Sequence, residues 1–153
     1  MESYIKELSI RWSDLDPNFH LRHTSYYDYA AQARIDLLHA MGLTINSMKE
    51  EGFGPVLFRE ECVFRREIRY GDVFQLTCKL KKARKDFSRF TIQHEFIRSD
   101  GTLCATLTID AAWIDTRARK LTIPPVNQDK LAGITKKNRR FCLGLSRNTS
   151  LAL

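Results

Sequence analysis

The feature that most constrains the fold is a run of four alternating segments that follows a single long helical segment. Between residues 56 and 113, apolar and polar residues alternate with a period of two, interrupted by Gly71-Asp72, by a charged bend at 82–86 and by Ser99-Asp100-Gly101. Period-two spacing places the apolar side chains on one face of a sheet, and short turns of this kind join antiparallel strands. This part of the chain predicts an antiparallel sheet with one covered face.

The segment before these strands has a helical period. Apolar residues recur every three or four positions, at Tyr26, Ala30, Ala33, Leu37 and Met41. The spacing predicts an amphipathic helix of about five turns. Thr24 or Ser25 is the expected N-cap, and Gly42 stands where a C′ glycine is expected.

The remaining elements complete a simple order. A loose alternation over residues 3–13 predicts a first strand, and residues 44–51 predict a short helical turn that ends at Gly52. One strand, one long helix and a run of antiparallel strands define an α+β domain, with the helix packed on a curved antiparallel sheet. A weak helix is expected at 127–132.

Length and composition indicate one globular domain. The chain has 153 residues, of which 43% are hydrophobic and 28% charged, which is typical of a folded domain. No apolar run approaches the roughly 20 residues that span a bilayer, and the first residues show no signal-peptide pattern, so we expect a cytoplasmic protein without a membrane segment. The four cysteines form no C-x-x-C pair and are expected to be reduced thiols.

Most of the positive charge is concentrated at the C-terminus. The formal net charge is +7, and residues 134–153 contain five basic residues and no acid, which leaves +2 for residues 1–133. We therefore expect a single domain over 1–133 followed by a basic tail over 134–153. The small charge of the domain disfavours a nucleic-acid-binding core, although the tail suits an anionic partner.

Acidic and histidine side chains, which can act in catalysis or ligand binding, gather between the first strand and the long helix. Asp14 and Asp16 are two residues apart, and His20 and His23 are three apart, directly before the helix. A helix start offers free N–H groups and the positive end of the helix dipole, so a carbonyl or anion held there meets donors beside a carboxylate. Two other interpretations are open: the acids cap turns, or the four residues ligate a metal, although their spacing matches no metal motif.

This stretch resembles the opening motif of the 4-hydroxybenzoyl-CoA thioesterase family of hotdog-fold proteins. That motif reads Asp-x-Asp-x-x-Gly-His-Val-Asn-Asn-x-x-Tyr. The matching residues are Asp14, Asp16, His20 and Tyr26, with Leu21 for valine, whereas Phe19, Arg22 and His23 replace a glycine and two asparagines. The resemblance implies a hotdog fold over about residues 5–115.

The resemblance also implies roles for the motif residues. Asp16 would be the general base or nucleophile, and the backbone N–H of His23 would polarise the thioester carbonyl. His20 would shape the loop or form a supporting hydrogen bond, with direct proton transfer as the alternative. Tyr26 would line the acyl pocket, and Phe19 stands where glycine permits a positive φ or a close approach to the ligand. No metal or cofactor is implied, because CoA enters only as part of the substrate.

Three further expectations concern partners. The phosphates of CoA are expected near a basic bend formed by Lys82, Arg84, Lys85 and Arg89, unless that bend is simply a solvated surface. The same charge would suit an acidic acyl carrier protein. Hotdog units generally pair, so the resemblance implies a homodimer or homotetramer with sites between subunits.

The sequence thus predicts an acyl-CoA thioesterase. Because Phe19, Arg22 and His23 depart from the motif, the alternative is a non-catalytic hotdog protein that binds an acyl thioester or an acyl carrier protein. A third interpretation is a binder of nucleic acid or acidic proteins that acts through the basic tail. His94, which alternates with apolar residues, is expected to be a core histidine.

Overall fold

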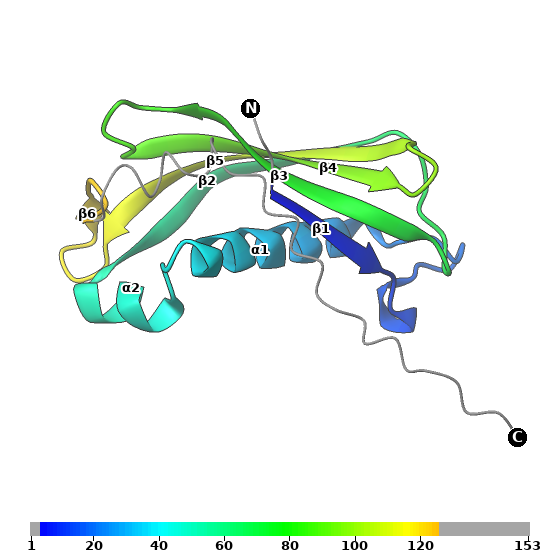
Figure 1. Cartoon of the computed structure of the whole chain (residues 1–153), viewed down its shortest axis with the longest axis horizontal. Helices are drawn as coiled ribbons and strands as arrows, with labels where there is room; N and C mark the ends of the chain where they lie inside the picture. The colour runs from blue at the N-terminus through cyan, green and yellow to red at the C-terminus, as the bar shows by residue number, and fades with distance from the viewer. Residues whose placement is uncertain (1–3, 126–153) are drawn as a thin grey trace, which may run out of the picture.

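The computed structural model describes residues 4–125 of the chain, in which one long helix lies along one face of a sheet (Figure 1). The elements in chain order are β1 (Tyr4–Ser9), a 3₁₀ helix η1 (Trp12–Asp14), α1 (His23–Ala40), α2 (Ile45–Glu51), β2 (Phe53–Phe64), β3 (Val73–Ala83), β4 (Arg89–Arg98), β5 (Leu103–Asp115) and β6 (Lys120–Leu121). This is the α+β architecture predicted from the sequence.

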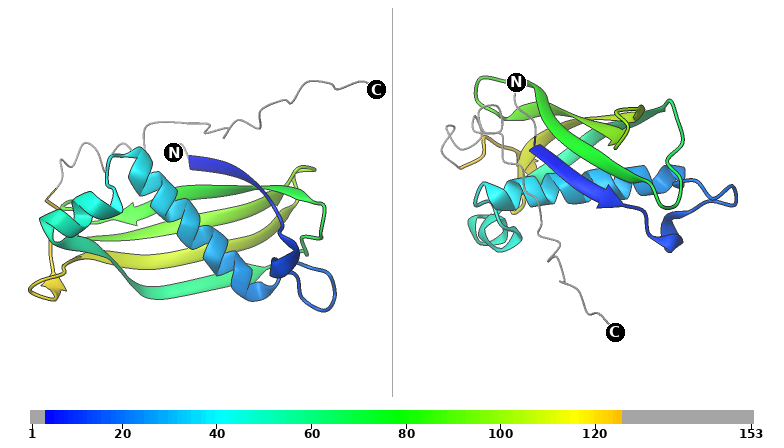
Figure 2. Two further views of the ribbon diagram at one scale, coloured as in Figure 1. Left: turned by 90° about the horizontal axis from the view of Figure 1, so that it is seen from below. Right: turned by 45° about the vertical axis from the view of Figure 1, so that its right-hand side comes forward.

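All strand pairs in the six-stranded sheet are antiparallel. The strand order is β1-β3-β4-β5-β2, and the two-residue β6 pairs with the end of β5. Register shifts interrupt the β2–β5, β3–β4 and β4–β5 pairs, and such bulges add to strand twist. The sheet curves around α1, which crosses its concave face obliquely (Figure 2). This arrangement confirms the hotdog fold.

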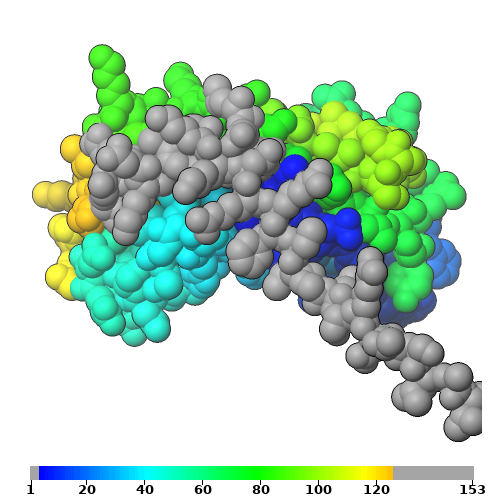
Figure 3. All heavy atoms as spheres, viewed as in Figure 1, coloured from blue at the N-terminus to red at the C-terminus, as the bar shows by residue number. Residues whose placement is uncertain are grey.

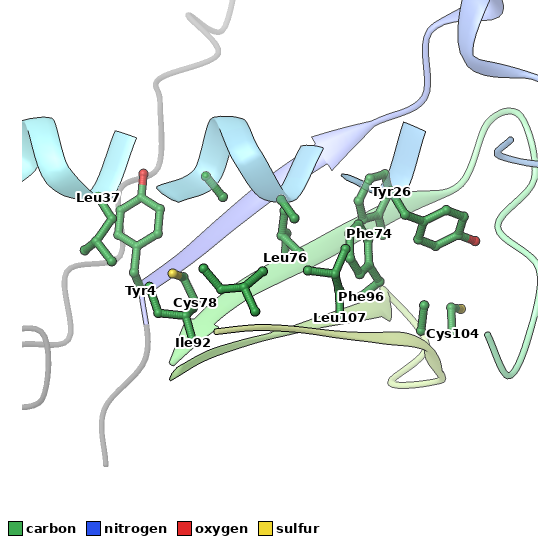
Figure 4. Packing of buried hydrophobic residues seen from close by; sticks show 14 of the residues in the cluster. Tyr4, Tyr26, Leu37, Phe74, Leu76, Cys78, Ile92, Phe96, Cys104 and Leu107 are labelled. Carbon is green, nitrogen blue, oxygen red and sulfur yellow. The ribbon is translucent and has the colours of Figure 1, made fainter. Parts of the chain in front are cut away.

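The core lies between α1 and the concave face of the sheet (Figure 4). Ala30 and Ala33 have no exposed surface, and their short side chains let the helix backbone approach the strands closely. The strands fill the layer with large side chains that are fully buried, which include Phe74, Leu76, Phe96 and Leu107. The alternation read from the sequence therefore marks the core face correctly in β3, β4 and β5. In β2 it does not, since Phe58 and Phe64 of the predicted apolar face are 56% and 49% exposed and a register shift lies between Leu57 and Arg59.

The helix ends follow the predicted glycine signals in two places, and a side-chain cap that was not predicted starts α2. Gly42 follows α1 with φ 81°, and Gly52 ends α2 with φ 75°, a conformation that glycine adopts without steric cost. The hydroxyl of Thr44 caps α2 by accepting a hydrogen bond from the Ser47 N–H at 3.1 Å. These local signals suffice because each acts within one turn of the helix.

The start of α1 differs from the prediction. The helix begins at His23 with Arg22 as N-cap, and no side chain caps it. Thr24 instead accepts a hydrogen bond from Arg22 Nε at 3.0 Å, and Ser25 is buried in the first turn. Good N-cap residue types were present, but the contacts of the preceding loop decide where the helix starts.

Two strand ends also differ from the prediction. The first strand ends at Ser9 instead of 13, because the Asp14 N–H donates to the Arg11 carbonyl at 3.0 Å and closes the η1 turn. The alternating segment that was predicted to run from residue 56 to the turn at Gly71-Asp72 ends as a strand at Phe64, and Ile68 is buried in the β2–β3 connection. The short β6 had no sequence signal.

His94 is a core histidine, as predicted. Its side chain is fully buried, its Nδ1–H donates to the Thr77 carbonyl at 3.0 Å, and its Nε2 accepts from Arg34 Nη1 at 3.3 Å. Burial lowers the pKa of His94 to about 3, with the Arg34 charge acting in the same direction. Arg34 of α1 also pairs with Glu60 of β2 at 3.1 Å, so one neutral histidine and one ion pair connect the helix to two strands.

Several predictions fall on residues that the structure does not describe. The boundary at 133, the basic tail, Cys142 and the helix at 127–132 lie outside residues 4–125. Within that range, Cys78 and Cys104 are buried free thiols and Cys62 is a half-buried one. No helix in residues 4–125 combines the length and the apolar character that a bilayer crossing requires.

Candidate functional site

The loop between η1 and α1, here called the acid loop (residues 14–22), is held closed by backbone hydrogen bonds. The Asp16 N–H donates to the His20 carbonyl at 2.8 Å, and the Phe19 N–H donates to the Asp16 carbonyl at 3.0 Å. The Leu21 N–H donates to the Ile68 carbonyl at 2.8 Å, which ties the loop to the β2–β3 connection. The loop is therefore a preformed element, since its backbone groups bond within it and to its neighbour.

Asp14 anchors this loop from inside the protein. It is buried, and its carboxylate accepts hydrogen bonds from Arg11 Nε at 2.8 Å, from Arg11 Nη2 at 2.9 Å and from the Tyr29 hydroxyl at 2.7 Å. The Arg11 hydrogen bonds lower the pKa of Asp14, against the opposing effect of burial. Both carboxylate oxygens are occupied, so Asp14 shapes the loop.

Asp16 is placed differently, with only one carboxylate oxygen engaged. Its Oδ1 accepts from the backbone N–H of Asn18 at 2.8 Å and of His20 at 3.0 Å. Within residues 4–125, no hydrogen-bond donor reaches its Oδ2. Asp16 thus closes a turn with one oxygen and keeps the other available for a ligand, so turn formation and chemistry are compatible in one residue.

The start of α1 lies beside Asp16. Within residues 4–125, no acceptor reaches the N–H of His23, which is the first residue of α1 and so has no partner inside the helix. An open hollow of about 340 Å³ joins these groups. We call it the acid pocket; its lining residues are Asp16, His20, Leu21, His23, Tyr26, Phe64, Arg65, Arg66 and Glu67. The structure therefore brings together Asp16, His20, His23 and Tyr26, four of the residues predicted from the sequence.

Four residues of this pocket were missed. Phe64 closes β2, and Arg65, Arg66 and Glu67 follow it in the β2–β3 connection. In the sequence they read as the continuation of an alternating strand. The one available signal was the break in alternation at Arg65-Arg66-Glu67, three consecutive charged residues before the buried Ile68.

Phe19 has the backbone conformation expected for the glycine of the motif. Its φ is 60°, in the left-handed region that costs a non-glycine residue about 1 kcal/mol or more. The loop therefore keeps its shape despite the substitution. The side chain, however, points to solvent with 61% exposure and does not line the acid pocket.

The basic bend lies far from Asp16 within the chain. Lys82, Arg84 and Arg89 line a second hollow of about 410 Å³, and Arg89 lies over the Phe58 ring at 5.5 Å. Lys85 does not line this hollow. The bend joins β3 to β4 at the end of the molecule that carries α2. The acid loop lies at the opposite end (Figures 1 and 3). A single chain cannot place the basic bend beside Asp16.

An apolar cavity of about 220 Å³ lies under the second half of α1. Its lining includes Ala31 and Leu38 from the helix, Leu57 from β2, Phe90 from β4 and Trp113 from β5. Tyr26 and Leu37 mark the two ends of the helix layer (Figure 4), and large core side chains fill the space between them. The cavity and the acid pocket are therefore separate within one chain.

A comparison with known families identifies the chain at the level of a superfamily. Residues 10–131 match the thioesterase-like superfamily. The chain belongs to this superfamily. Membership confirms the predicted enzyme class, a thioester hydrolase, and it agrees with the family resemblance stated from the sequence.

Relatives of this thioesterase-like protein are distant. A protein of Aquifex aeolicus strain VF5, provisionally named an esterase, is 26% identical over 94 residues, which cover 61% of this chain and 70% of the relative. A Staphylococcus aureus protein solved in complex with CoA has a TM-score of 0.82 at 16% identity, covering 99% of this chain and 96% of that one. The 1,4-dihydroxy-2-naphthoyl-CoA thioesterase of Synechocystis has a TM-score of 0.76 at 18% identity over 88% and 96% of the two chains. At these identities the solved structures support the fold alone.

The metal interpretation finds no geometric support in residues 4–125. No three histidine, cysteine or carboxylate side chains gather there at metal-ligating positions. Asp14 in particular turns toward Arg11 and Tyr29.

We predict that Asp14→Asn weakens the fold in a pH-dependent way. Because the folded-state pKa of Asp14 is lowered, its stabilisation is present above the ordinary carboxyl pKa of about 4 and is lost as the pH falls through the lower folded value. Urea unfolding should show a loss of about 2 kcal/mol at pH 7, shrinking toward zero below about pH 4. Asp28→Asn, at an exposed position of α1, is the control. If Asp14→Asn lost the same free energy of unfolding at pH 7 and below about pH 4, the ion pair of Asp14 would not be the source of the stabilisation.

Proposed function

We propose that this thioesterase-like protein hydrolyses acyl-CoA thioesters to a free acid and CoA, with Asp16 as the reacting carboxylate. One observation carries the proposal: the Asp16 Oδ2, which accepts no hydrogen bond, and the His23 N–H, which donates none, face the same pocket. Thioester hydrolysis needs a carboxylate or other base together with a donor for the carbonyl oxygen, and the acid pocket supplies both.

The geometry suggests how the residues would act. The thioester oxygen would accept a hydrogen bond from the His23 N–H at the positive end of α1, where developing negative charge is stabilised. Asp16 Oδ2 would take a proton from water as the water attacks the carbonyl carbon, or would attack that carbon itself to form an anhydride that water then cleaves. In either route the C–S bond breaks and the thiolate leaves, to be protonated to CoA.

His20 has a supporting position in this scheme. Its backbone N–H donates to Asp16 Oδ1 at 3.0 Å, so it helps to orient the carboxylate whether or not its ring transfers a proton. We assign His20 a positioning role, and Tyr26, which is buried with its ring against Phe64 at 5.1 Å, a place in the wall of the pocket.

We further propose a homodimer formed through β2. This strand is one edge of the sheet, and its side chains Leu57, Phe58, Val63 and Phe64 are 44–56% exposed. An edge with free backbone groups and apolar side chains favours pairing with another strand. A two-fold axis would pair two β2 strands antiparallel. The Phe64 end of one chain would then meet the Phe53 end of its partner, and two such dimers could form a homotetramer.

The dimer would unite features that one chain keeps apart. It would bring the acid pocket of one chain to the end of the sheet where the other chain carries the basic bend and the apolar cavity. We propose that the acyl group enters this cavity, while the positive charge of the bend steers the anionic CoA or an acidic acyl carrier protein toward the site without binding the phosphates itself. CoA-bound and CoA-thioesterase structures of the same fold support the acyl-CoA choice.

Binding without hydrolysis is the alternative function. It is favoured by the use of Asp16 Oδ1 in a turn and by the replacement of two motif asparagines.

No cofactor takes part in the proposed reaction. We propose a cytoplasmic location, which the free thiols of Cys62, Cys78 and Cys104 support because such thiols persist in reducing compartments.

The first test is Asp16→Asn. Asparagine keeps an oxygen that can accept the Asn18 and His20 N–H groups, so the loop should persist while the carboxylate is lost. We expect thiol release from acyl-CoA to fall about 100- to 10,000-fold, with an unchanged melting temperature. Asp28→Asn is the matched control, and full activity in Asp16→Asn would refute the mechanism.

The second test removes the backbone donor of His23. Proline is favoured at the first helical position and has no N–H, and Arg22 already has the extended conformation (φ −61°, ψ 138°) that precedes proline. We expect His23→Pro to lower kcat about 100- to 1,000-fold, whereas His23→Ala, which keeps the N–H, should retain most activity. Equal losses in both variants would show that the imidazole, and not the backbone, is required.

The third test uses mixed dimers. Ala31→Phe, at an exposed helix position that lines the cavity, should block octanoyl-CoA but spare acetyl-CoA, and Asp16→Asn should block both. Consider a dimer of one Ala31→Phe chain and one Asp16→Asn chain. If each site combines Asp16 of one chain with the cavity of the other, this dimer has one intact site, because the Ala31→Phe chain supplies Asp16 and the Asp16→Asn chain supplies an open cavity. It should hydrolyse octanoyl-CoA at about half the wild-type rate. An inactive mixed dimer would place Asp16 and the acyl group in the same chain.

A further inference from the structure

Three exposed aromatic side chains form a patch beside the acid loop. Trp12 lies in η1, Phe19 in the acid loop and Tyr70 in the β2–β3 connection, and they are 68%, 61% and 59% exposed. The Trp12 ring centroid is 6.4 Å from that of Phe19 and 6.1 Å from that of Tyr70. We call these three residues the aromatic patch.

The patch is costly for the fold to maintain. Trp12 contacts each of the other two rings. All three rings still leave most of their apolar surface in water, although burying that surface would be favourable. Phe19 also holds a left-handed backbone conformation that glycine would adopt without strain. Large rings kept exposed on strained or irregular backbone indicate a binding surface.

The charges around the patch are mainly positive. Arg22 precedes α1, and Arg65 and Arg66 line the acid pocket; none of the three pairs with a carboxylate of residues 4–125. Arg11 and Arg69 each bond one carboxylate, yet their side chains stay 70% and 63% exposed. These five arginines surround the junction of the acid loop with the β2–β3 connection.

The patch and the acid pocket share the same backbone. The Phe19 N–H donates to the Asp16 carbonyl at 3.0 Å, and His20 pairs with Arg69, the residue before Tyr70. A ligand that reaches from the pocket over the acid loop would therefore meet the arginines first and then the rings. The ligand chemistry that fits is a flat aromatic ring joined to phosphates, since exposed rings stack on bases and guanidinium groups bind phosphate.

We propose that the aromatic patch binds the adenine of CoA, with Arg22, Arg65 and Arg66 as partners for its phosphates. This inference rests on the proposed acyl-CoA substrate and deepens it. It assigns the nucleotide to the chain that supplies Asp16, on a surface distinct from the basic bend of Lys82, Arg84 and Arg89.

The structure supplies a direct optical probe. The described part of the chain contains Trp12, which is 68% exposed, and Trp113, which is 2% exposed. Titration of the Asp16→Asn protein with adenosine 3′,5′-bisphosphate should quench the tryptophan emission saturably. The quenching should disappear in Trp12→Phe, and Arg65→Gln with Arg66→Gln should raise the dissociation constant. This readout does not require hydrolysis, so it separates failure of the nucleotide site from failure of the proposed reaction.

A kinetic comparison tests the same site in the active enzyme. Trp12→Ala should raise KM for an acyl-CoA about ten-fold more than for the same acyl group on N-acetylcysteamine, which lacks the nucleotide. Arg84→Gln is the matched variant, because it removes a charge of the basic hollow instead and lies outside β2. Absence of quenching, equal KM changes for the two thioesters, or a larger effect of Arg84→Gln would each overturn the proposal. Binding of acyl carrier protein in place of the nucleotide would overturn it too.

Discussion

The close packing of α1 on the sheet is the contact on which the rest of the structure depends. Ala30 and Ala33 are fully buried and hold the helix close to the strands, while Arg34 joins it to His94 and Glu60. Apolar packing opposes separation of the two layers, and the directional polar contacts define how the helix lies over β4 and β2. The N-terminus of α1 is consequently held at one end of the sheet, where its free N–H groups can face a ligand.

Two acids of one short motif have divided roles in this site. Asp14 is buried, and its carboxylate is used by Arg11 and Tyr29, so its charge stabilises the loop. Asp16 bonds two backbone N–H groups of the loop through one oxygen and leaves the other open. The inner acid thus holds the loop that carries the outer acid, and the proposed reaction would depend on this preorganisation.

The chain separates parts that an acyl-CoA thioesterase needs together. The acid pocket is at the start of α1, and the apolar cavity and basic bend lie toward the other end of the layer. The exposed apolar edge of β2 offers the physical means to unite them in a dimer. The aromatic patch beside the acid loop adds a surface for the nucleotide in the same chain as Asp16. The proposed site is therefore built from ordinary loop and strand-end residues, and its function depends on how two copies meet.

The sequence by itself determined the elements and the identity of the acid loop. Period-two and helical spacing act through local geometry, and the turn glycines act through φ. The helices, five of the six strands and the roles of Gly42 and Gly52 could therefore be predicted from neighbouring residues. The motif resemblance likewise identified Asp16, His20, His23 and Tyr26. Only the tertiary structure decided the start of α1, the membership of Arg65 and Arg66 in the pocket, the outward position of Phe19 and the distance of the basic bend from Asp16. Each of these depends on contacts between segments far apart in the chain, such as Leu21 with Ile68, and no local pattern encodes them.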